Sequence, residues 1–273
     1  MPTLYLVATP IGNLGDITMR ALRVLGEVGI IAAEDTRTTR KLLHAHGLRN
    51  RLTSFHEDNK KAKIPLLLKE LETKDVALVS EAGTPGISDP GYDLVVAAIE
   101  SGIPVVPLPG PSAVLVALAV SGLPTRQFVY LGFLPRLKAD RHKLLASVAG
   151  EERTLVAFEA PHRMERCLLD IKDILGDRNT AVCRELTKVH EEVFRGSISQ
   201  ALDHFRQNYR GEFTLVIEGS PEKKTAPLLT DKVLAEMRRL KMEGVPAKEV
   251  LFHIAQTTGL ARRELYRAWL RLD

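Results

Sequence analysis

Short, nearly continuous apolar runs alternate with longer helical patterns over the first 123 residues. The runs are only four or five residues long, as expected of parallel strands that are covered on both faces. Predicted strands are residues 4–8, 30–33, 76–80 and 105–108. Predicted helices are residues 19–28, 37–46, 60–73, 92–101 and 113–121. This alternation predicts an α/β layer fold.

Turn residues at 121–124 (Ser-Gly-Leu-Pro) suggest a boundary between a first domain, 1–123, and a second, 124–221. The second segment has clearer apolar-polar alternation, which fits an α/β domain whose sheet has some antiparallel pairing. Predicted strands are residues 129–132, 154–159, 180–184 and 212–218, and predicted helices are 140–149, 164–175 and 198–208.

The last segment, 222–273, is predicted to be a small helical domain. After a polar stretch at 221–227, the pattern predicts three short helices at 231–243, 247–257 and 262–270, an arrangement similar to a helix-turn-helix. Thr230 is the expected N-cap of the first, and Gly259 marks the turn before the last. Residues 222–273 carry 11 Lys and Arg but 7 Asp and Glu, so the whole net charge of +4 falls here. A basic tail on a neutral body favours an anionic partner, with nucleic acid first.

Composition sets broader limits. With 45% hydrophobic and 26% charged residues, the chain is not disordered, collagen-like or a coiled coil. Cys167 and Cys183 are far apart and part of no metal-binding motif, so we expect no metal site and a reducing cytoplasm. We also expect neither a signal peptide nor a membrane span, because the start lacks a basic region and no apolar stretch reaches 18 residues.

Three Gly- and Pro-rich loops follow the first, third and fourth predicted strands. They include Pro10 and Ile11; then Gly83, Thr84, Pro85, Ile87, Ser88 and Asp89; then Ser112 and Ala113. Ligands of open α/β sheets bind at the carboxyl ends of strands, so we expect these loops to form a ligand site. They match neither the dinucleotide fingerprint nor the P-loop. Ser112 also fits a simple helix cap.

Three polar clusters are further candidates. Arg37, Arg40 and Lys41 fall on one helical face, which either contacts phosphate or is merely solvated. Acids, bases and arginines also follow two strands of the second segment, at 158–163 and 183–192. Ordinary salt bridges explain some of this, and no zinc-protease or nucleophile-elbow motif is present.

Five segments in order carry a resemblance: L-Y-L-V-A-T-P-I-G-N-L-G-D, A-E-D-T-R-x-T-R-x-L-L, S-E-A-G-T-P-G-I-S-D-P-G, P-L-P-G-P-S-A and F-E-A-P-H-R. With them the chain resembles the tetrapyrrole methylase superfamily, and within it the branch that methylates ribosomal RNA. The resemblance implies two α/β domains of the class III methyltransferase type that bind S-adenosylmethionine, usually in a homodimer. It further implies 2′-O-methylation of a cytidine in the decoding region of 16S rRNA in the 30S subunit.

The resemblance also indicates site residues. It places Ile11, Thr84, Ile87, Ser88, Ser112 and Ala113 beside the cofactor, with Phe158, Glu212, Phe213 and Thr214 from the second domain. Two motifs depart from the superfamily pattern. Residues 8–12 stand where G-x-G-P-G is common, and Thr84 replaces the Asp of G-D-P.

Removal of the proton from a ribose hydroxyl requires a base. Candidates are Glu159, His162, Glu185 and His190, with Arg184 or Arg163 holding phosphate, and the sequence does not choose among them. Arg262, Arg263 and Arg267 are the expected RNA contacts of the last helix. Two alternatives stay open: a small-molecule methyltransferase of the tetrapyrrole type, and a DNA-binding regulator with a ligand-sensing body.

Overall fold

The computed structural model describes all residues except 207–209, 222–228, 259, 261 and 273. It divides into two compact units, Met1–Ser220 and Pro221–Asp273. Most of the polar stretch expected at 221–227, the end of the helix expected at 198–208, and the turn expected at Gly259 lie outside the described residues.

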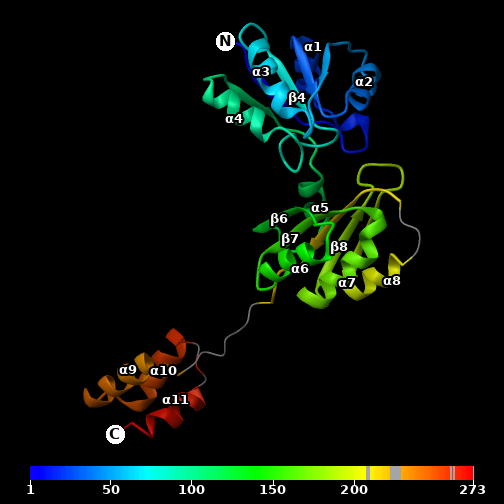
Figure 1. The fold of residues 1–273 in the computed structure, drawn as a ribbon. Coiled ribbons are helices and arrows are strands. Elements are labelled where there is room, and N and C mark those ends of the chain that lie inside the picture. Colours follow the sequence, from blue (N-terminus) through cyan, green and yellow to red (C-terminus); the bar gives the residue numbers. More distant parts are fainter. Residues whose placement is uncertain (207–209, 222–228, 259, 261, 273) are drawn as a thin grey trace. The chain divides into compact units, whose positions relative to one another are not determined.

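The first half of the larger unit is a five-stranded parallel sheet. Its strands are β1 (Leu4–Val7), β2 (Ile30–Ala33), β3 (Leu52–Ser54), β4 (Val76–Val79) and β5 (Val105–Leu108), in the order β3-β2-β4-β1-β5. Helices α1 (Met19–Glu27) and α2 (Thr36–Ala45) pack on one face (Figure 1). Helices α3 (Lys60–Glu70) and α4 (Tyr92–Glu100) pack on the other. Because both faces are covered, the four strands other than the edge strand β3 are apolar, and the predicted α/β architecture is confirmed.

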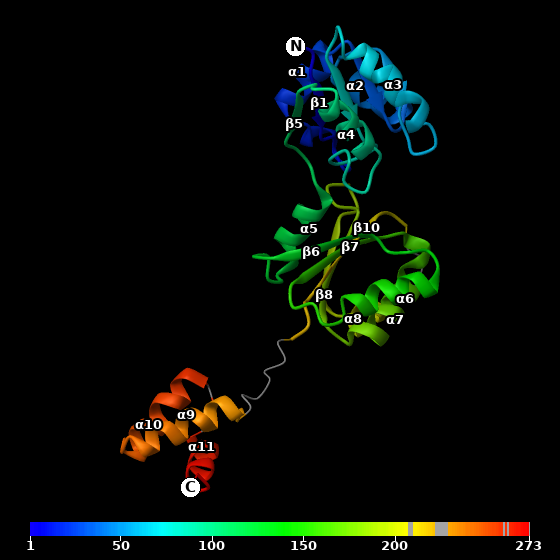
Figure 2. The same ribbon diagram turned by 60° about the vertical axis from the view of Figure 1, so that its left-hand side comes forward.

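The second half is a mixed five-stranded sheet. Its strands are β6 (Phe128–Phe133), β7 (Thr154–Glu159), β8 (Asn179–Arg184), β9 (Glu192–Ser197) and β10 (Phe213–Ile217), in the order β6-β7-β10-β8-β9. Only β6 and β7 pair in parallel, and the other pairs are antiparallel, as the alternation predicted. Helices α6 (Lys138–Ser147), α7 (Met164–Leu175) and α8 (Ile198–His204) cover one face (Figure 2).

Helix α5 (Ala113–Ser121) covers the opposite face of this second sheet. It follows β5 of the first sheet, yet its buried side chains Val114, Ala117 and Leu118 pack against Val156 and Val216. The chain therefore passes from the parallel sheet and its helices to the mixed sheet before residue 113. The domain boundary expected after residue 123 remains a prediction.

Two short 3-10 helices, Leu14–Asp16 and Pro161–Arg163, follow β1 and β7. Both strands that the pattern missed, β3 and β9, lie at sheet edges.

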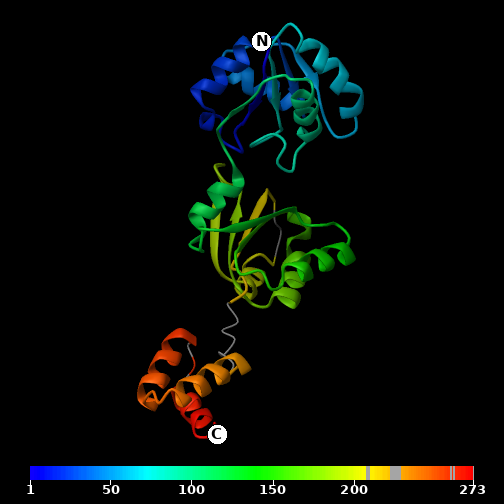
Figure 3. The ribbon, with the colours of Figure 1, turned by 90° about the vertical axis from the view of Figure 1, so that its left-hand side faces the viewer.

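The smaller unit consists of α9 (Asp231–Met242), α10 (Ala247–Thr258) and α11 (Arg262–Trp269) (Figure 3). Its core is formed by Met237, Val250, Ile254 and Leu265. The Thr230 hydroxyl accepts a hydrogen bond from Val233 N, so the predicted N-cap and the three predicted helices are confirmed. Among the described residues of both units, no helix has the length and apolarity that crossing a bilayer requires.

Candidate cofactor site and neighbouring surfaces

The loops after β4, β1 and β5 come from three adjacent strands and touch one another. Thr9 and Gly83 exchange two backbone hydrogen bonds, of 2.8 and 2.9 Å. The Thr84 hydroxyl lies 3.5 Å from the carbonyl oxygen of Pro111. The convergence that the three sequence motifs predicted is therefore present at the carboxyl edge of the sheet, where α/β proteins bind ligands.

Gly83 and Gly110 allow these loops to approach closely, because a glycine has no side chain to fill the space between them. Gly83 has a φ of +80°, and a Cβ there would lie 3.6 Å from Ile11 Cγ2 and 3.9 Å from Pro111 O. At Gly110, a Cβ would lie 2.9 Å from that of Ala8. A side chain at Gly83 would thus project between the three loops.

The second sheet contributes two aromatic side chains, Tyr130 and Phe158, next to these loops. The Ser88 hydroxyl lies 2.7 Å from that of Tyr130 on β6, and the rings of Tyr130 and Phe158 meet edge to face at 5.4 Å. Phe158 belongs to one apolar cluster with Ile11 and Ala113. Burial raises the pKa of Tyr130, although the hydrogen bond with Ser88 opposes this, so the phenol stays protonated at neutral pH.

The loop after β8 packs on the loop after β1. Asn13 N donates to the Thr187 hydroxyl at 3.1 Å. A Cβ on Gly12 would lie 2.4 Å from Lys188 Cγ and 2.9 Å from Leu186 O. Both Glu185 and Thr187 have a positive φ, of 51° and 67°, a backbone conformation that L-residues seldom adopt. Strained backbone of this kind, at a contact between two loops, is often found at functional sites.

Lys188 ties that loop to the start of β10. Its ammonium lies 2.9 Å from Glu185 Oε1 and 3.2 Å from Glu212 Oε2. Burial acts to lower the pKa of Lys188, but the two carboxylates outweigh it and the pKa is raised. Burial likewise acts to raise the pKa of Glu185, but Lys188 and the N–H of Glu212 lower it overall. Glu185 is therefore held as a carboxylate and is a poor proton acceptor.

Carboxylates gather at the ends of β2 and β4. Glu34 Oε2 accepts a hydrogen bond from Glu81 N at 3.0 Å. Burial and the charge of Glu34 raise the pKa of Asp89 to about 6, while Ser80 acts in the opposite direction. The same two effects raise the pKa of Glu81.

Strand register sorts the candidates of the second sheet onto two faces. Phe158, Thr214 and Cys183 are paired across β7, β10 and β8 and share the face of Ile11 and α5. One residue along, Glu159, Phe213 and Arg184 are paired on the opposite face, under α7 and α8. The structure therefore brings Phe158 and Thr214 to the three loops but not Phe213.

The catalytic candidates differ in how freely they can react. Glu159 is buried and forms an ion pair with Arg163, and one of its oxygens also accepts a hydrogen bond from Ala160 N. Arg184 donates to Arg210 O and lies 3.2 Å from Glu192 Oε2. By contrast, His162 and His190 are exposed, in the turns that follow β7 and β8.

The remaining predicted residues are placed as follows. Ser112 is the residue before α5, but its side chain makes no capping hydrogen bond, which leaves its hydroxyl available. Ile87 is exposed and Pro85 is buried, while Pro10 is half-buried. Glu212 is engaged by Lys188. Tyr130, Thr187 and Lys188 were not among the predicted site residues.

The basic candidates are all on the surface. Arg37 is paired with Asp35 at 3.0 Å, an interaction that lowers the pKa of Asp35 to about 2, whereas Arg40 and Lys41 are exposed residues of the same helix, α2. In the smaller unit Arg262, Arg263 and Arg267 are exposed on α11.

Comparisons with known proteins agree with this architecture. The family model of the tetrapyrrole (corrin/porphyrin) methylases matches residues 3–202. A crystal structure of uroporphyrin-III-C-methyltransferase from Thermus thermophilus superimposes with a TM-score of 0.58 and 20% identity over 80% of this chain and 94% of that one. At this identity the likeness shows the fold alone.

Curated relatives are much closer in sequence. Ribosomal RNA small subunit methyltransferase I of Synechocystis sp. is 45% identical over all of this chain and 99% of its own length. The protein of the same name from Halalkalibacterium halodurans is 44% identical over 98% of this chain and 94% of its own. That of Thermotoga maritima is 50% identical over 99% of its own length but 80% of this chain. The chain belongs to the tetrapyrrole methylase family and, within it, to the family of ribosomal RNA small subunit methyltransferase I.

Proposed function

We propose that this protein transfers a methyl group from S-adenosylmethionine to the 2′-hydroxyl of a cytidine in 16S rRNA. The observation that carries the proposal is the meeting of three adjacent strand-end loops with Phe158 and Tyr130, in a chain closely similar to rRNA methyltransferases along its length. We further propose that the substrate is the 30S subunit, that the enzyme acts in the cytoplasm, and that it forms a homodimer.

The residues at this edge fit S-adenosylmethionine. Ile11, Ala113 and Phe158 supply apolar surface of the kind an adenine ring needs. Hydroxyls of Thr84, Ser88 and Ser112 and the loop backbone supply polar partners for the ribose and the amino acid part. When bound, the cofactor supplies a methyl group activated by its sulfonium.

The protein must orient the ribose hydroxyl and remove its proton. We propose His162 or His190 as the base, because imidazole suits this role at neutral pH and both side chains are exposed. Glu159 is buried against Arg163, and Glu185 is bound to Lys188. These two carboxylates are better placed to shape the loops than to accept a proton.

The small-molecule alternative has less support. Two solved enzymes of the tetrapyrrole type, uroporphyrin-III-C-methyltransferase and cobalt precorrin-4 methyltransferase, are 20% and 17% identical to this chain, whereas a curated rRNA methyltransferase is 45% identical over its full length. The basic residues on α11 also favour a polyanionic substrate over a porphyrinoid.

The test of the base compares His162→Ala, His190→Ala, Glu159→Gln and Glu185→Gln at saturating cofactor, with labelled S-adenosylmethionine and 30S subunits from unmethylated cells. We expect one histidine variant to lose about a hundredfold or more in turnover. Unchanged turnover in both histidine variants would refute this placement of the base. If the wild-type protein transfers no label to rRNA, the proposed function itself is wrong.

A further inference from the structure

The smaller unit leaves two of its three aromatic rings outside its core. Trp269 packs against the core, but Phe252 is 47% exposed and Tyr266 is 50% exposed. A domain of this size has little apolar surface to spare for solvent. Two exposed rings therefore point to a binding surface rather than to packing.

Arg262 lies over one of these rings and on the same helix as the other. The guanidinium carbon of Arg262 lies 4.9 Å from the centre of the Phe252 ring, a cation–π contact. Tyr266 stands four residues after Arg262 on α11, on the same side of the helix. We call these three residues, Phe252, Arg262 and Tyr266, the aromatic patch.

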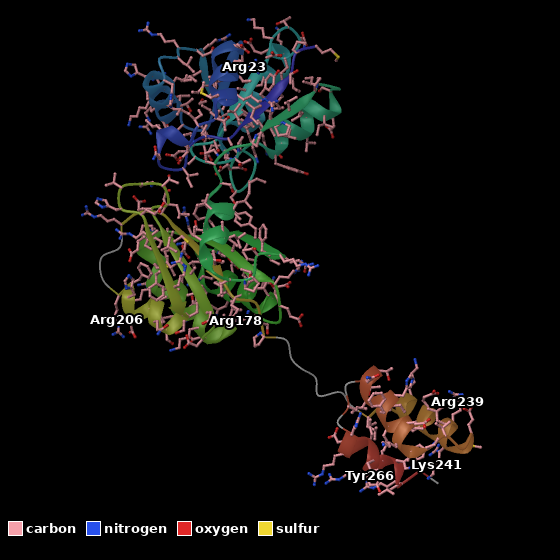
Figure 4. The ribbon with its side chains drawn as sticks, turned by 180° about the vertical axis from the view of Figure 1, so that it is seen from behind. Arg23, Arg178, Arg206, Arg239, Lys241 and Tyr266 are labelled. Atoms are coloured by element: carbon pink, nitrogen blue, oxygen red, sulfur yellow. The ribbon has the colours of Figure 1, made fainter. Side chains whose placement is uncertain are left out.

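The charges of the unit separate into engaged and free groups. Arg239 is paired with Glu236 and Glu243, each at 2.7 Å, and Lys241 donates to the carbonyl oxygen of Leu272 (Figure 4). Arg263 and Arg267 are exposed and form no ion pair within the part of the chain that the structure describes. Two unpaired guanidinium groups are thus on α11, the helix that also carries Arg262 and Tyr266. Arg238 on α9 and Arg271 are likewise exposed and form no ion pair among the described residues.

We infer that the aromatic patch binds an unpaired base of the RNA substrate by stacking, while Arg263 and Arg267 contact the flanking phosphates. Aromatic rings and guanidinium planes are the surfaces on which proteins stack unpaired RNA bases. A paired duplex offers no free base face at its sides, and the major groove of A-form RNA is too narrow for a helix such as α11. Charge alone would serve a duplex equally well, so the exposed rings are what favours single-stranded RNA.

This inference rests on the proposed function, since it takes RNA as the substrate, and it adds what kind of RNA the smaller unit recognises. Duplex DNA, the substrate of a regulator, is the competing partner. Binding of duplex DNA would depend on the arginines, which contact phosphates, but not on the aromatic rings.

The full-length protein can be titrated with a short unpaired RNA, with that RNA annealed to its complement, and with duplex DNA of the same sequence, each fluorescently labelled. We expect tightest binding to the unpaired RNA. Tyr266→Ala and Phe252→Ala should each weaken that binding about tenfold while leaving duplex binding unchanged. Tyr266→Phe, which keeps the ring, should bind like the wild type.

Arg239→Ala is the matched control, because it removes an arginine of the same unit that is already paired with carboxylates. Arg239→Ala should weaken the binding of unpaired RNA less than Arg263→Ala does. Equal losses on paired and unpaired RNA, no loss on either, or a preference for duplex DNA would each overturn the stacking inference. Label transfer from S-adenosylmethionine to 30S rRNA by the wild type, measured in parallel, shows whether the methyltransferase function holds regardless of that result.

Discussion

The hydroxyl of Ser88, in the loop after β4, lies 2.7 Å from the hydroxyl of Tyr130 on β6. Ser88 has a φ of +64°, which a serine adopts only when its surroundings hold it there. The contact joins a loop of the parallel sheet to the edge strand of the mixed sheet, next to Phe158. The proposed cofactor site therefore depends on both sheets.

A double-mutant cycle tests this dependence. Tyr130→Phe and Ser88→Ala should each weaken S-adenosylmethionine binding several-fold, because each removes one hydrogen bond worth about 1 kcal/mol. The combined variant should be no weaker than either single variant, since both remove the same contact. Isothermal titration with the cofactor gives the three affinities. Additive losses would mean that the two hydroxyls act separately.

Gly12 provides a second test of the contact between the halves. Alanine there would put its Cβ 2.9 Å from the backbone oxygen of Leu186 as well as against Lys188, so Gly12→Ala should displace the loop after β1. We expect about a tenfold loss of cofactor affinity and a lower stability, of about 1–3 kcal/mol. Gly150→Ala is the control, because a Cβ at Gly150 meets nothing within 4 Å. If both variants bind the cofactor equally well, this loop contact is not needed for the site.

The raised pKa of Asp89 predicts a pH-dependent stability. Between its ordinary value of 3.8 and the folded value of about 6, the folded protein holds a proton that the unfolded chain has released. Rising pH in this window therefore favours unfolding. Asp89→Asn removes the effect, so the variant should gain on the order of 1 kcal/mol relative to the wild type between pH 4 and pH 7.

Urea titrations at several pH values measure this difference. Asp177→Asn is the matched control with the opposite sign. The N–H of Ser199 holds the pKa of Asp177 below its usual value, so the loss of this carboxylate should cost more stability at pH 7 than at pH 4. Two parallel pH profiles for Asp89→Asn and the wild type would show that Asp89 titrates normally.

Removal of the smaller unit separates RNA affinity from cofactor binding. The described residues of Met1–Ser220 form a compact unit, and 80% of this chain matches 99% of the length of the Thermotoga maritima relative. A chain ending at Ser220 should therefore bind S-adenosylmethionine within about twofold of the full-length affinity. Its binding to 30S subunits should fall about tenfold or more and depend less on salt, because the net charge of +4 goes with residues 222–273. Unchanged 30S binding would refute an RNA role for this unit.

Much of the fold could be predicted because the buried strands have almost entirely apolar sequences. β1, β2, β4 and β5 are apolar at nearly every position, since helices cover both faces of their sheet. β3 has only three half-buried residues, and the polar edge strand β9 lacks a buried face, so neither gave a readable pattern. Edge strands are partly exposed to solvent, and residues 183–192, just before and at the start of β9, have the pattern of a polar cluster rather than of a strand.

The site was predicted in part for the same reason. Adjacent parallel strands place their carboxyl-end loops together, so Gly83, Thr84 and Ser112 could be grouped from the sequence. The period of two along β7 already implied that Phe158 and Glu159 face opposite sides. The contacts of Tyr130 with Ser88 and of Thr187 with Asn13 depend on how the two sheets pack, which no local pattern encodes.

The most direct test of the proposed function uses labelled S-adenosylmethionine, the full-length protein, and 30S subunits from cells that lack this methylation. After incubation the 16S rRNA is hydrolysed with alkali, which cleaves only next to a free 2′-hydroxyl. We predict that the label is recovered in a single alkali-resistant dinucleotide whose first residue is a 2′-O-methylcytidine. Label on a base, on another nucleotide, or absent from the rRNA would contradict the proposed reaction.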